Sequence, residues 1–216
     1  NPDLTADEFP FDVKKVGTSS PFFDIVKLED VSKNLISRMP AETVYENVLS
    51  WAKDFDSKWY EILSNDKEYA IKMFNIDRNI AKPRKDIIKW SNIPELYNYF
   101  YDSEFEAESR EDYAIENISS KAKELLNDYL TVFNANDTKE EWFNNIKELG
   151  AKYGYAKEVK EYKKNPTEYV GHCGDVCTLI RVALTGRAQT PDLYEILKLF
   201  GADRIKARFE KFVSMI

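Results

Sequence analysis

The chain is poor in the residues on which many metal sites and secreted folds depend. Its 216 residues include only two cysteines, Cys173 and Cys177, and one histidine, His172. Two cysteines give no disulfide framework for a secreted fold, so we expect a reducing, cytoplasmic location. One histidine cannot form a two-histidine zinc site, and a single C-x3-C pair is a weak zinc signal. We therefore predict no metal site and interpret these residues as helix-start residues and buried thiols.

Glycine and proline are also scarce, with 7 and 8 residues. This scarcity disfavours a β architecture with many turns, while 43% hydrophobic and 32% charged residues suit long helices around a core. The composition therefore predicts an all-α fold. Neither G-x-x-x-x-G-K-[S/T] nor G-x-G-x-x-G occurs, so no glycine-rich loop can cradle a phosphate.

Long apolar runs are missing as well. No stretch of about 18 apolar residues could span a bilayer, and the first residues, NPDLTADEFPFD, do not have the pattern of a signal peptide. We expect no membrane association.

The formal net charge of −7 argues against general nucleic-acid binding, and we expect no binding to DNA. The charge is unevenly distributed, however. Residues 91–148 hold 5 Lys or Arg and 14 Asp or Glu, whereas residues 72–90 hold 6 against 2 and residues 171–216 hold 7 against 5. An acidic middle thus lies between two less acidic segments.

Helical spacing of apolar residues begins near Lys27 and continues to the acidic stretch at residues 102–118. The first predicted helix has an apolar stripe of Leu28, Val31, Leu35 and Ile36, and Pro40 separates it from the next helix. Pro83 predicts a local break. The lead-in, up to about residue 23, is expected to be ordered and packed through its aromatic side chains, Phe9, Phe11, Phe22 and Phe23.

Residues 102–118 are acidic and weakly patterned, which is typical of a junction between two helical units. We place the boundary near residues 105–115, giving units 1–110 and 111–216. In the second unit, Ser119 or Ser120 is expected to cap one helix. Thr138 and Glu141 form a capping box for the next helix, which Gly150 is expected to close.

Near the C-terminus, the stretch LIRVALTGRAQTPDLYEIL at residues 179–197 places two helix ends close together. Gly186 is a natural C-terminal cap, and Thr190 with Pro191 is expected to start the following helix. One interpretation is a tight helical hairpin with solvated Arg181 and Arg187. The other is a pocket in which backbone N–H groups and guanidinium groups bind a phosphate or the edge of an unstacked base.

The stretch LIRVALTGRAQTPDLYEILKLFGADRIKAR resembles the end of bacterial glutamyl-tRNA synthetases, with their Leu-Arg-x-Ala-Leu-Thr-Gly, Pro-x-Leu-x-Glu and Leu-Gly-x-x-Arg patterns. SSPFFDIVKL at residues 19–28 and IAKPRKDIIKW at residues 80–90 are similar to earlier elements of the same family. The resemblance covers nearly the whole chain. It implies an all-α, two-subdomain cage that holds the anticodon loop of tRNA(Glu).

The chain has no HIGH-type or KMSKS-type motif, so it holds no catalytic residue and no cofactor of its own. The resemblance implies that ATP and Mg²⁺ serve a catalytic domain of a larger glutamate–tRNA ligase. It also implies site residues. Arg84 matches the arginine that reads the third anticodon base, a cytosine, and indicates a preference for glutamate over glutamine tRNA.

The remaining pocket residues follow from the same match: Arg181, Thr190, Pro191 and Leu193 line the pocket for the other anticodon bases. Lys82, Lys85 and Arg187 are candidate phosphate contacts. The acidic residues 91–148 would face away from the tRNA, and we expect a monomer. Two alternatives stay open: the similar helical cage of a class I lysyl-tRNA synthetase, and a helical protein-interaction module, which the net charge of −7 suits.

Overall fold

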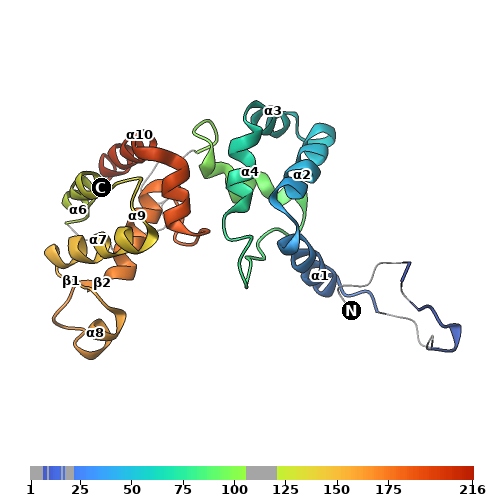
Figure 1. Cartoon of the computed structure of the whole chain (residues 1–216), viewed down its shortest axis with the longest axis horizontal. Coiled ribbons are helices and arrows are strands. Elements are labelled where there is room, and N and C mark those ends of the chain that lie inside the picture. Colours follow the sequence, from blue (N-terminus) through green and yellow to red (C-terminus); the bar gives the residue numbers. More distant parts are fainter. Residues whose placement is uncertain (1–6, 9, 16, 18–21, 106–120) are drawn as a thin grey trace.

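The computed structural model describes residues 7–8, 10–15, 17, 22–105 and 121–216. The described chain is all-α as expected, apart from a parallel pair of two-residue strands. Figure 1 shows the helices in two groups, one holding α1–α4 and the other α6–α10. We call residues 22–105 the N-terminal half and residues 121–216 the C-terminal half. The predicted boundary near residue 110 and the caps at Ser119 or Ser120 lie outside the described residues.

The elements of the N-terminal half, with the short turn that precedes it, are η1 (Val13–Lys15), α1 (Ile25–Arg38), α2 (Ala41–Phe55), α3 (Ser57–Asn65), α4 (Lys67–Asn75), η2 (Trp90–Asn92), α5 (Ile93–Tyr97) and η3 (Asn98–Phe100). Pro40 precedes α2, as predicted. Two aspartates then make sharp corners. Asp56 ends α2 and accepts a hydrogen bond from the Trp59 N–H of α3. Asp66 likewise ends α3 and accepts a hydrogen bond from the Tyr69 N–H of α4.

The apolar stripe of α1 is mostly on the surface. Ile36 is buried, but Leu28, Val31 and Leu35 are about half exposed. The expected aromatic packing of the lead-in is also wrong for the described residues, because Phe11, Phe22 and Phe23 are exposed; Phe9 lies outside them. Helical spacing correctly predicted a helix at α1, but the described residues leave most of its apolar face uncovered.

The elements of the C-terminal half are α6 (Ala122–Val132), α7 (Lys139–Lys152), β1 (Tyr155–Ala156), α8 (Val159–Lys164), β2 (Gly171–His172), α9 (Cys173–Thr185) and α10 (Leu193–Val213). The predicted capping box is confirmed: the Thr138 hydroxyl accepts from the Glu141 N–H at 3.2 Å, and Glu141 accepts from the Thr138 N–H at 2.8 Å. Gly150 does not close α7. It is buried inside the helix, where an added Cβ would lie 3.0 Å from Val176.

Helix α10 consists of two helical pieces that meet at Gly201. This residue has a left-handed φ of 73°, which glycine adopts without a Cβ clash. The first piece buries Leu193, Ile196, Leu197 and Phe200, and the second buries Ile205, Phe209 and Phe212. Phe200 packs edge-on against Phe100 of the other half, with 5.8 Å between ring centres. The apolar core is therefore continuous between the halves.

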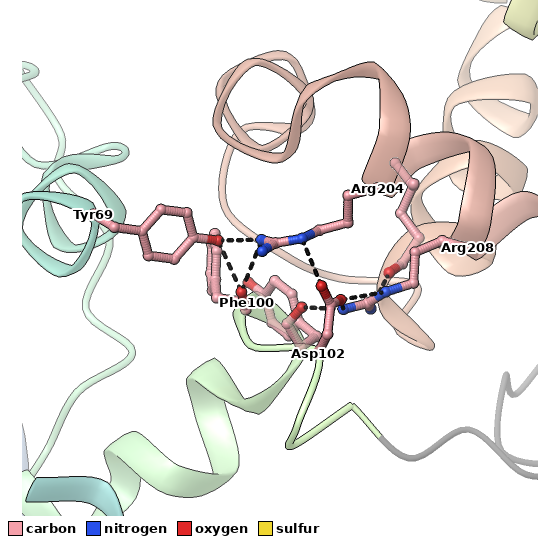
Figure 2. Close-up of polar contacts among 7 residues, drawn as sticks. Tyr69, Phe100, Asp102, Arg204 and Arg208 are labelled. Carbon is pink, nitrogen blue, oxygen red and sulfur yellow. Dashed lines mark hydrogen bonds and ion pairs between the residues drawn. The ribbon is translucent and has the colours of Figure 1, made fainter. Parts of the chain in front are cut away.

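A polar cluster joins the two halves beside this aromatic contact, as Figure 2 shows. We call it the latch; its members are Tyr69, Phe100, Asp102, Arg204 and Arg208. Asp102 accepts from Arg208 Nη2 at 2.5 Å and pairs with Arg204 Nε at 3.0 Å. Arg204 Nη1 also donates to the Tyr69 hydroxyl at 2.7 Å and to the Phe100 carbonyl at 3.1 Å.

Arg208 is the buried charged residue of the latch, with 5% of its surface exposed. A buried guanidinium needs partners for its N–H groups. Arg208 finds them in Asp102, the Leu184 carbonyl at 2.9 Å and the Tyr99 carbonyl at 3.2 Å. The latch therefore ties the end of α9 and the second piece of α10 to the N-terminal half.

No helix in the described part of the chain is both long and apolar enough to cross a membrane.

Replacing Asp102 with Ala removes the carboxylate of the latch and leaves Arg208 buried with fewer acceptors. We expect the free energy of unfolding to fall by about 1–3 kcal/mol, measured by urea denaturation. Glu210→Ala is the matched control, because its carboxylate lies 3.9 Å from Lys206 and both side chains are exposed. It should change stability by less than about 0.5 kcal/mol. Equal losses in the two variants would contradict the role of the latch.

Candidate functional site

The segment between α9 and α10, residues 186–192, runs along the contact between the two halves. We call it the crossing segment. Gly186 ends α9 with a left-handed φ of 69°, as predicted. The Thr185 hydroxyl donates to the Arg181 carbonyl at 2.7 Å and accepts from the Arg187 N–H at 3.2 Å. These bonds fix the direction in which the chain leaves α9.

The expected start of the next helix at Thr190 and Pro191 is wrong. Asp192 is the N-cap of α10, because its Oδ1 accepts from the Glu195 N–H at 3.1 Å and the helix begins at Leu193. Thr190 is buried, and its hydroxyl donates to the Pro191 carbonyl at 2.9 Å. Thr190 and Pro191 thus form a wall ahead of the helix rather than its first turn.

Three side chains of the two halves hold the crossing segment against the N-terminal half. Asp77 Oδ2 accepts from the Asp192 N–H at 2.9 Å, and Arg84 Nη1 donates to the Thr190 carbonyl at 3.0 Å. Arg187, within the segment, donates through Nη2 to the Glu95 carbonyl and lies 5.4 Å from the Tyr99 ring. The segment is therefore anchored at its start and at its end.

Arg84 lies in the loop between α4 and η2, where Pro83 prevents a helix. Its guanidinium is half exposed and is held on two sides: Nε donates to Asp86 at 2.6 Å, and Nη1 bonds the Thr190 carbonyl. Among the described residues, Nη2 has no hydrogen-bond partner. Arg84 therefore has a fixed orientation and retains donors for another molecule.

Two hollows share the wall of Thr190 and Pro191. The smaller, of about 300 Å³, is lined by Arg84, Asp86, Leu96, Tyr97, Tyr99, Arg187, Gln189, Thr190 and Pro191. The larger, of about 710 Å³, is lined by Asp77, Lys139, Glu140, Trp142, Phe143, Cys177, Arg181, Thr190, Pro191, Asp192, Leu193 and Tyr194. The structure thus brings Arg84 and Arg187 to one side of the wall, and Arg181 and Leu193 to the other.

Arg181 has an unusual environment in the larger hollow. Its Nε is buried, and no described residue accepts a hydrogen bond from it. Such a buried donor without an acceptor is rare in folded proteins and costs free energy. Cys177 lies one helical turn before Arg181 on α9 and also lines the hollow. Because solvent does not reach Nε, a group that enters this hollow can contact Arg181 only through its terminal Nη1 and Nη2 groups.

Aromatic rings form a second wall of the larger hollow. Trp142 of α7 and Tyr194 of α10 pack together with 5.6 Å between ring centres. Both polar ends are already bonded within the protein: Trp142 Nε1 donates to the Tyr129 hydroxyl at 3.0 Å, and the Tyr194 hydroxyl donates to the Asp137 carbonyl at 2.6 Å. This wall therefore offers apolar ring surface rather than hydrogen bonds.

The charges around the larger hollow disfavour an anion. Asp77, Glu140 and Asp192 bring three carboxylates, against the cations of Lys139 and Arg181. Lys139 is paired with Asp192, and this hydrogen bond raises the pKa of Lys139. A phosphate would meet net negative charge here, whereas a neutral planar group with a carbonyl would meet Arg181 and the aromatic wall.

The candidate phosphate contacts lie in two places. Lys82 and Lys85 are exposed and line a third hollow, of about 710 Å³, together with Arg38 and Arg78. Arg187 lies apart from them, half-buried against Tyr99. The structure therefore brings Lys82 and Lys85 together, and places Arg187 beside Arg84.

Sequence reasoning did not find Asp77, Asp86, Trp142 or Tyr194 as residues of the site. The turn signal in NIDRN, after α4, could have drawn attention to Asp77, because Asp tolerates turn conformations. The aromatic residues carried only a core signal, and no local pattern showed that they face a hollow.

Comparison with known proteins decides the family. Residues 167–213, which include α9, the crossing segment and α10, match the family model described as an anticodon binding domain. Over 213 residues the chain is 39% identical to a glutamate–tRNA ligase of Acetivibrio thermocellus, and over 217 residues 38% identical to one of Clostridium perfringens strain SM101. One from Sorangium cellulosum is 36% identical over 215 residues.

The chain belongs to the glutamate–tRNA ligase family. These alignments cover 99–100% of the chain but only 37–39% of the length of the relatives. Four of the residues that the family resemblance assigns to the anticodon bases, Arg181, Thr190, Pro191 and Leu193, lie within the part that matches the anticodon binding domain.

His172 and the two cysteines have the structural roles that the sequence predicts, as a helix-start residue and as thiols within the protein. His172 is the N-cap of α9: its Nδ1 accepts from the Gly174 N–H at 3.0 Å, and Asp175 accepts from the His172 N–H at 2.8 Å. Cys173 is buried and Cys177 is partly buried. No group of three or more potential metal-binding side chains occurs among the described residues.

Burial raises the pKa of the Cys177 thiol from 9.0 to about 11. In a Cys173→Ala variant, we therefore expect alkylation by iodoacetamide at pH 8 to be about 100-fold slower in the folded chain than in urea, because the thiolate fraction falls tenfold per pKa unit. Because the folded state binds the Cys177 proton more tightly than the unfolded state does, this proton contributes to the free energy of unfolding. The contribution is full below about pH 9 and is lost as the pH rises towards about 11. Mass spectrometry measures the rate. Equal rates in the folded and unfolded chain would contradict this placement of Cys177.

Proposed function

We propose that the chain is the anticodon-recognition part of a glutamate–tRNA ligase, and that it binds the anticodon loop of tRNA(Glu). The observation that carries the proposal is the pair of hollows on either side of Thr190 and Pro191, one lined by Arg84 and Arg187 and the other by Arg181. A single-stranded loop presents unstacked bases whose edges such groups can read. The similarity to glutamate–tRNA ligases supports this proposal and favours glutamate over the lysine alternative.

Arg84 is suited to reading a cytosine at the third anticodon position. A cytosine presents two acceptors, O2 and N3, on its pairing edge, and a planar guanidinium can donate to two acceptors at once. Asp86 and the Thr190 carbonyl hold the guanidinium before the base arrives. This arrangement reduces the side-chain entropy that binding would otherwise cost.

Arg181, with Thr190, Pro191 and Leu193, is suited to hold another anticodon base in the larger hollow. The terminal Nη groups of Arg181 would donate to a base carbonyl, and the rings of Trp142 and Tyr194 would cover apolar base surface. The carboxylates around this hollow would keep phosphates outside it.

The backbone of the loop would then follow Lys82 and Lys85, in the segment where basic residues outnumber acidic ones. The expectation that residues 91–148 face away from the tRNA does not fit this proposal, because residues of that range line both hollows: Leu96, Tyr97, Tyr99, Lys139, Glu140, Trp142 and Phe143. Arg187 would contact phosphate only through N–H groups beyond those bonded to Glu95 and Asn98. We further propose subdomains 1–110 and 111–216, a monomer, and a cytoplasmic location. In the whole protein, ATP and Mg²⁺ would serve a catalytic part that attaches glutamate to the tRNA.

Arg84→Gln should relax discrimination at the third anticodon base. We expect the preference for cytosine over the other bases, measured by fluorescence anisotropy with RNA hairpins, to fall about tenfold, since a good bidentate contact is worth about 1–3 kcal/mol. The matched control is Lys85→Gln, which should weaken binding to every hairpin alike and reduce the salt dependence. If Arg84→Gln also weakens all hairpins alike, Arg84 does not read the third base.

Arg181→Met should separate binding from stability. The variant removes a buried donor that lacks an acceptor, so we expect the free energy of unfolding to stay within about 1 kcal/mol of the wild type or to rise. Binding to a hairpin with a glutamate anticodon should weaken at least about tenfold.

The matched control for that experiment is Arg208→Met, which removes a buried guanidinium that is fully engaged in the latch. It should lower the free energy of unfolding by about 3 kcal/mol, because it leaves acceptors buried without donors. Two results would refute the role of Arg181: a loss of stability in Arg181→Met as large as in this control, or RNA binding by Arg181→Met equal to that of the wild type.

A further inference from the structure

Asp77 has a backbone conformation that few residues adopt. It follows α4 with a left-handed φ of 57°, and it is the only non-glycine residue with a positive φ in the described part of the chain. For residues with a Cβ this region is strained, and Asp and Asn tolerate it best. Strained residues of this kind gather at functional sites, where the surrounding structure keeps them in place.

The strained backbone directs the Asp77 side chain to the end of the crossing segment. Asp77 Oδ2 accepts from the Asp192 N–H at 2.9 Å, a bond between the two halves. The Asp77 carbonyl accepts from the Arg84 N–H at 3.4 Å. One residue thus bonds both Asp192, directly after the wall of Thr190 and Pro191, and the loop that carries Arg84.

Asp192 is fixed from three directions. Its N–H is bonded to Asp77, its Oδ1 caps α10, and its Oδ2 is paired with Lys139. Only the first of these bonds comes from the N-terminal half. Asp77 therefore fixes the end of the wall of Thr190 and Pro191, while the bond from Arg84 to the Thr190 carbonyl fixes its beginning.

We propose that Asp77 is a positioning residue for anticodon recognition. It holds Asp192 so that Thr190, Pro191 and Leu193 stand where the first two anticodon bases can pack against them. This inference rests on the proposed function. Asp77 needs its acceptor oxygen and its left-handed backbone for this role, and it needs no negative charge.

Two substitutions separate these requirements. Asp77→Gly accepts the left-handed φ without strain and removes only the side-chain acceptor. Asp77→Asn keeps an acceptor oxygen and tolerates the same backbone conformation, so it tests rescue. Asp77 belongs neither to the latch nor to the apolar core, so we expect both variants to fold, with thermal midpoints within a few degrees of the wild type.

The experiment compares the 216-residue chain and its two variants with four RNA hairpins: one with a glutamate anticodon and three changed at its first, second or third base. We expect Asp77→Gly to lose about five- to tenfold of the discrimination at the first two positions and less at the third. Asp77→Asn should discriminate within about twofold of the wild type.

The outcomes distinguish the inference from the proposed function. If the wild type discriminates and Asp77→Gly discriminates equally well, the inference about Asp77 is overturned and anticodon recognition stands. If Asp77→Asn fails as Asp77→Gly does, the accepted hydrogen bond is not the cause, and the inference is again overturned. If the wild type binds all four hairpins alike, the proposed function falls, and the inference falls with it.

Discussion

The ion pairs of Arg204 and Arg208 with Asp102 hold the two halves of the molecule together. Arg208 is buried, and its guanidinium is compatible with burial only because Asp102 and the carbonyls of Leu184 and Tyr99 surround it. The Leu184 carbonyl lies at the end of α9, and the Tyr99 carbonyl lies in η3. The latch therefore fixes the point at which the crossing segment leaves α9. The positions of Thr190 and Pro191 relative to Arg84 depend on that point. A site built from two halves therefore relies on a contact outside the site.

The two guanidinium groups of the candidate site differ in how they are prepared for a ligand. Arg84 is exposed and held by hydrogen bonds, so its free N–H groups already point in a fixed direction. Arg181 is held by packing, and its buried Nε lacks a partner. The first arrangement favours selectivity for a base edge, and the second leaves only the terminal Nη groups of Arg181 for an acceptor that enters the hollow. Carboxylates around the larger hollow favour a neutral base over a phosphate.

Local chemistry made much of the fold predictable. The helical spacing, the capping box of Thr138 and Glu141 and the turn at Gly186 each depend on residues within a few positions of one another, and each is confirmed. The start of α10 was misplaced because Asp192, two residues after Thr190, is the stronger cap. Asp77 and Asp102 escaped prediction, since their partners lie 115 and 106 residues away and leave no periodic signal. The match to the family model includes the crossing segment, but the roles of its residues remain proposals.

The central claim is that anticodon bases enter the two hollows beside Thr190 and Pro191. A photoreactive base at the second anticodon position of an RNA hairpin with a glutamate anticodon tests it most directly, with the attachment site read by mass spectrometry. The account predicts attachment at residues that line the larger hollow, within Lys139–Phe143, Cys177–Arg181 or Thr190–Tyr194. Attachment confined to α1 or α8 would contradict it.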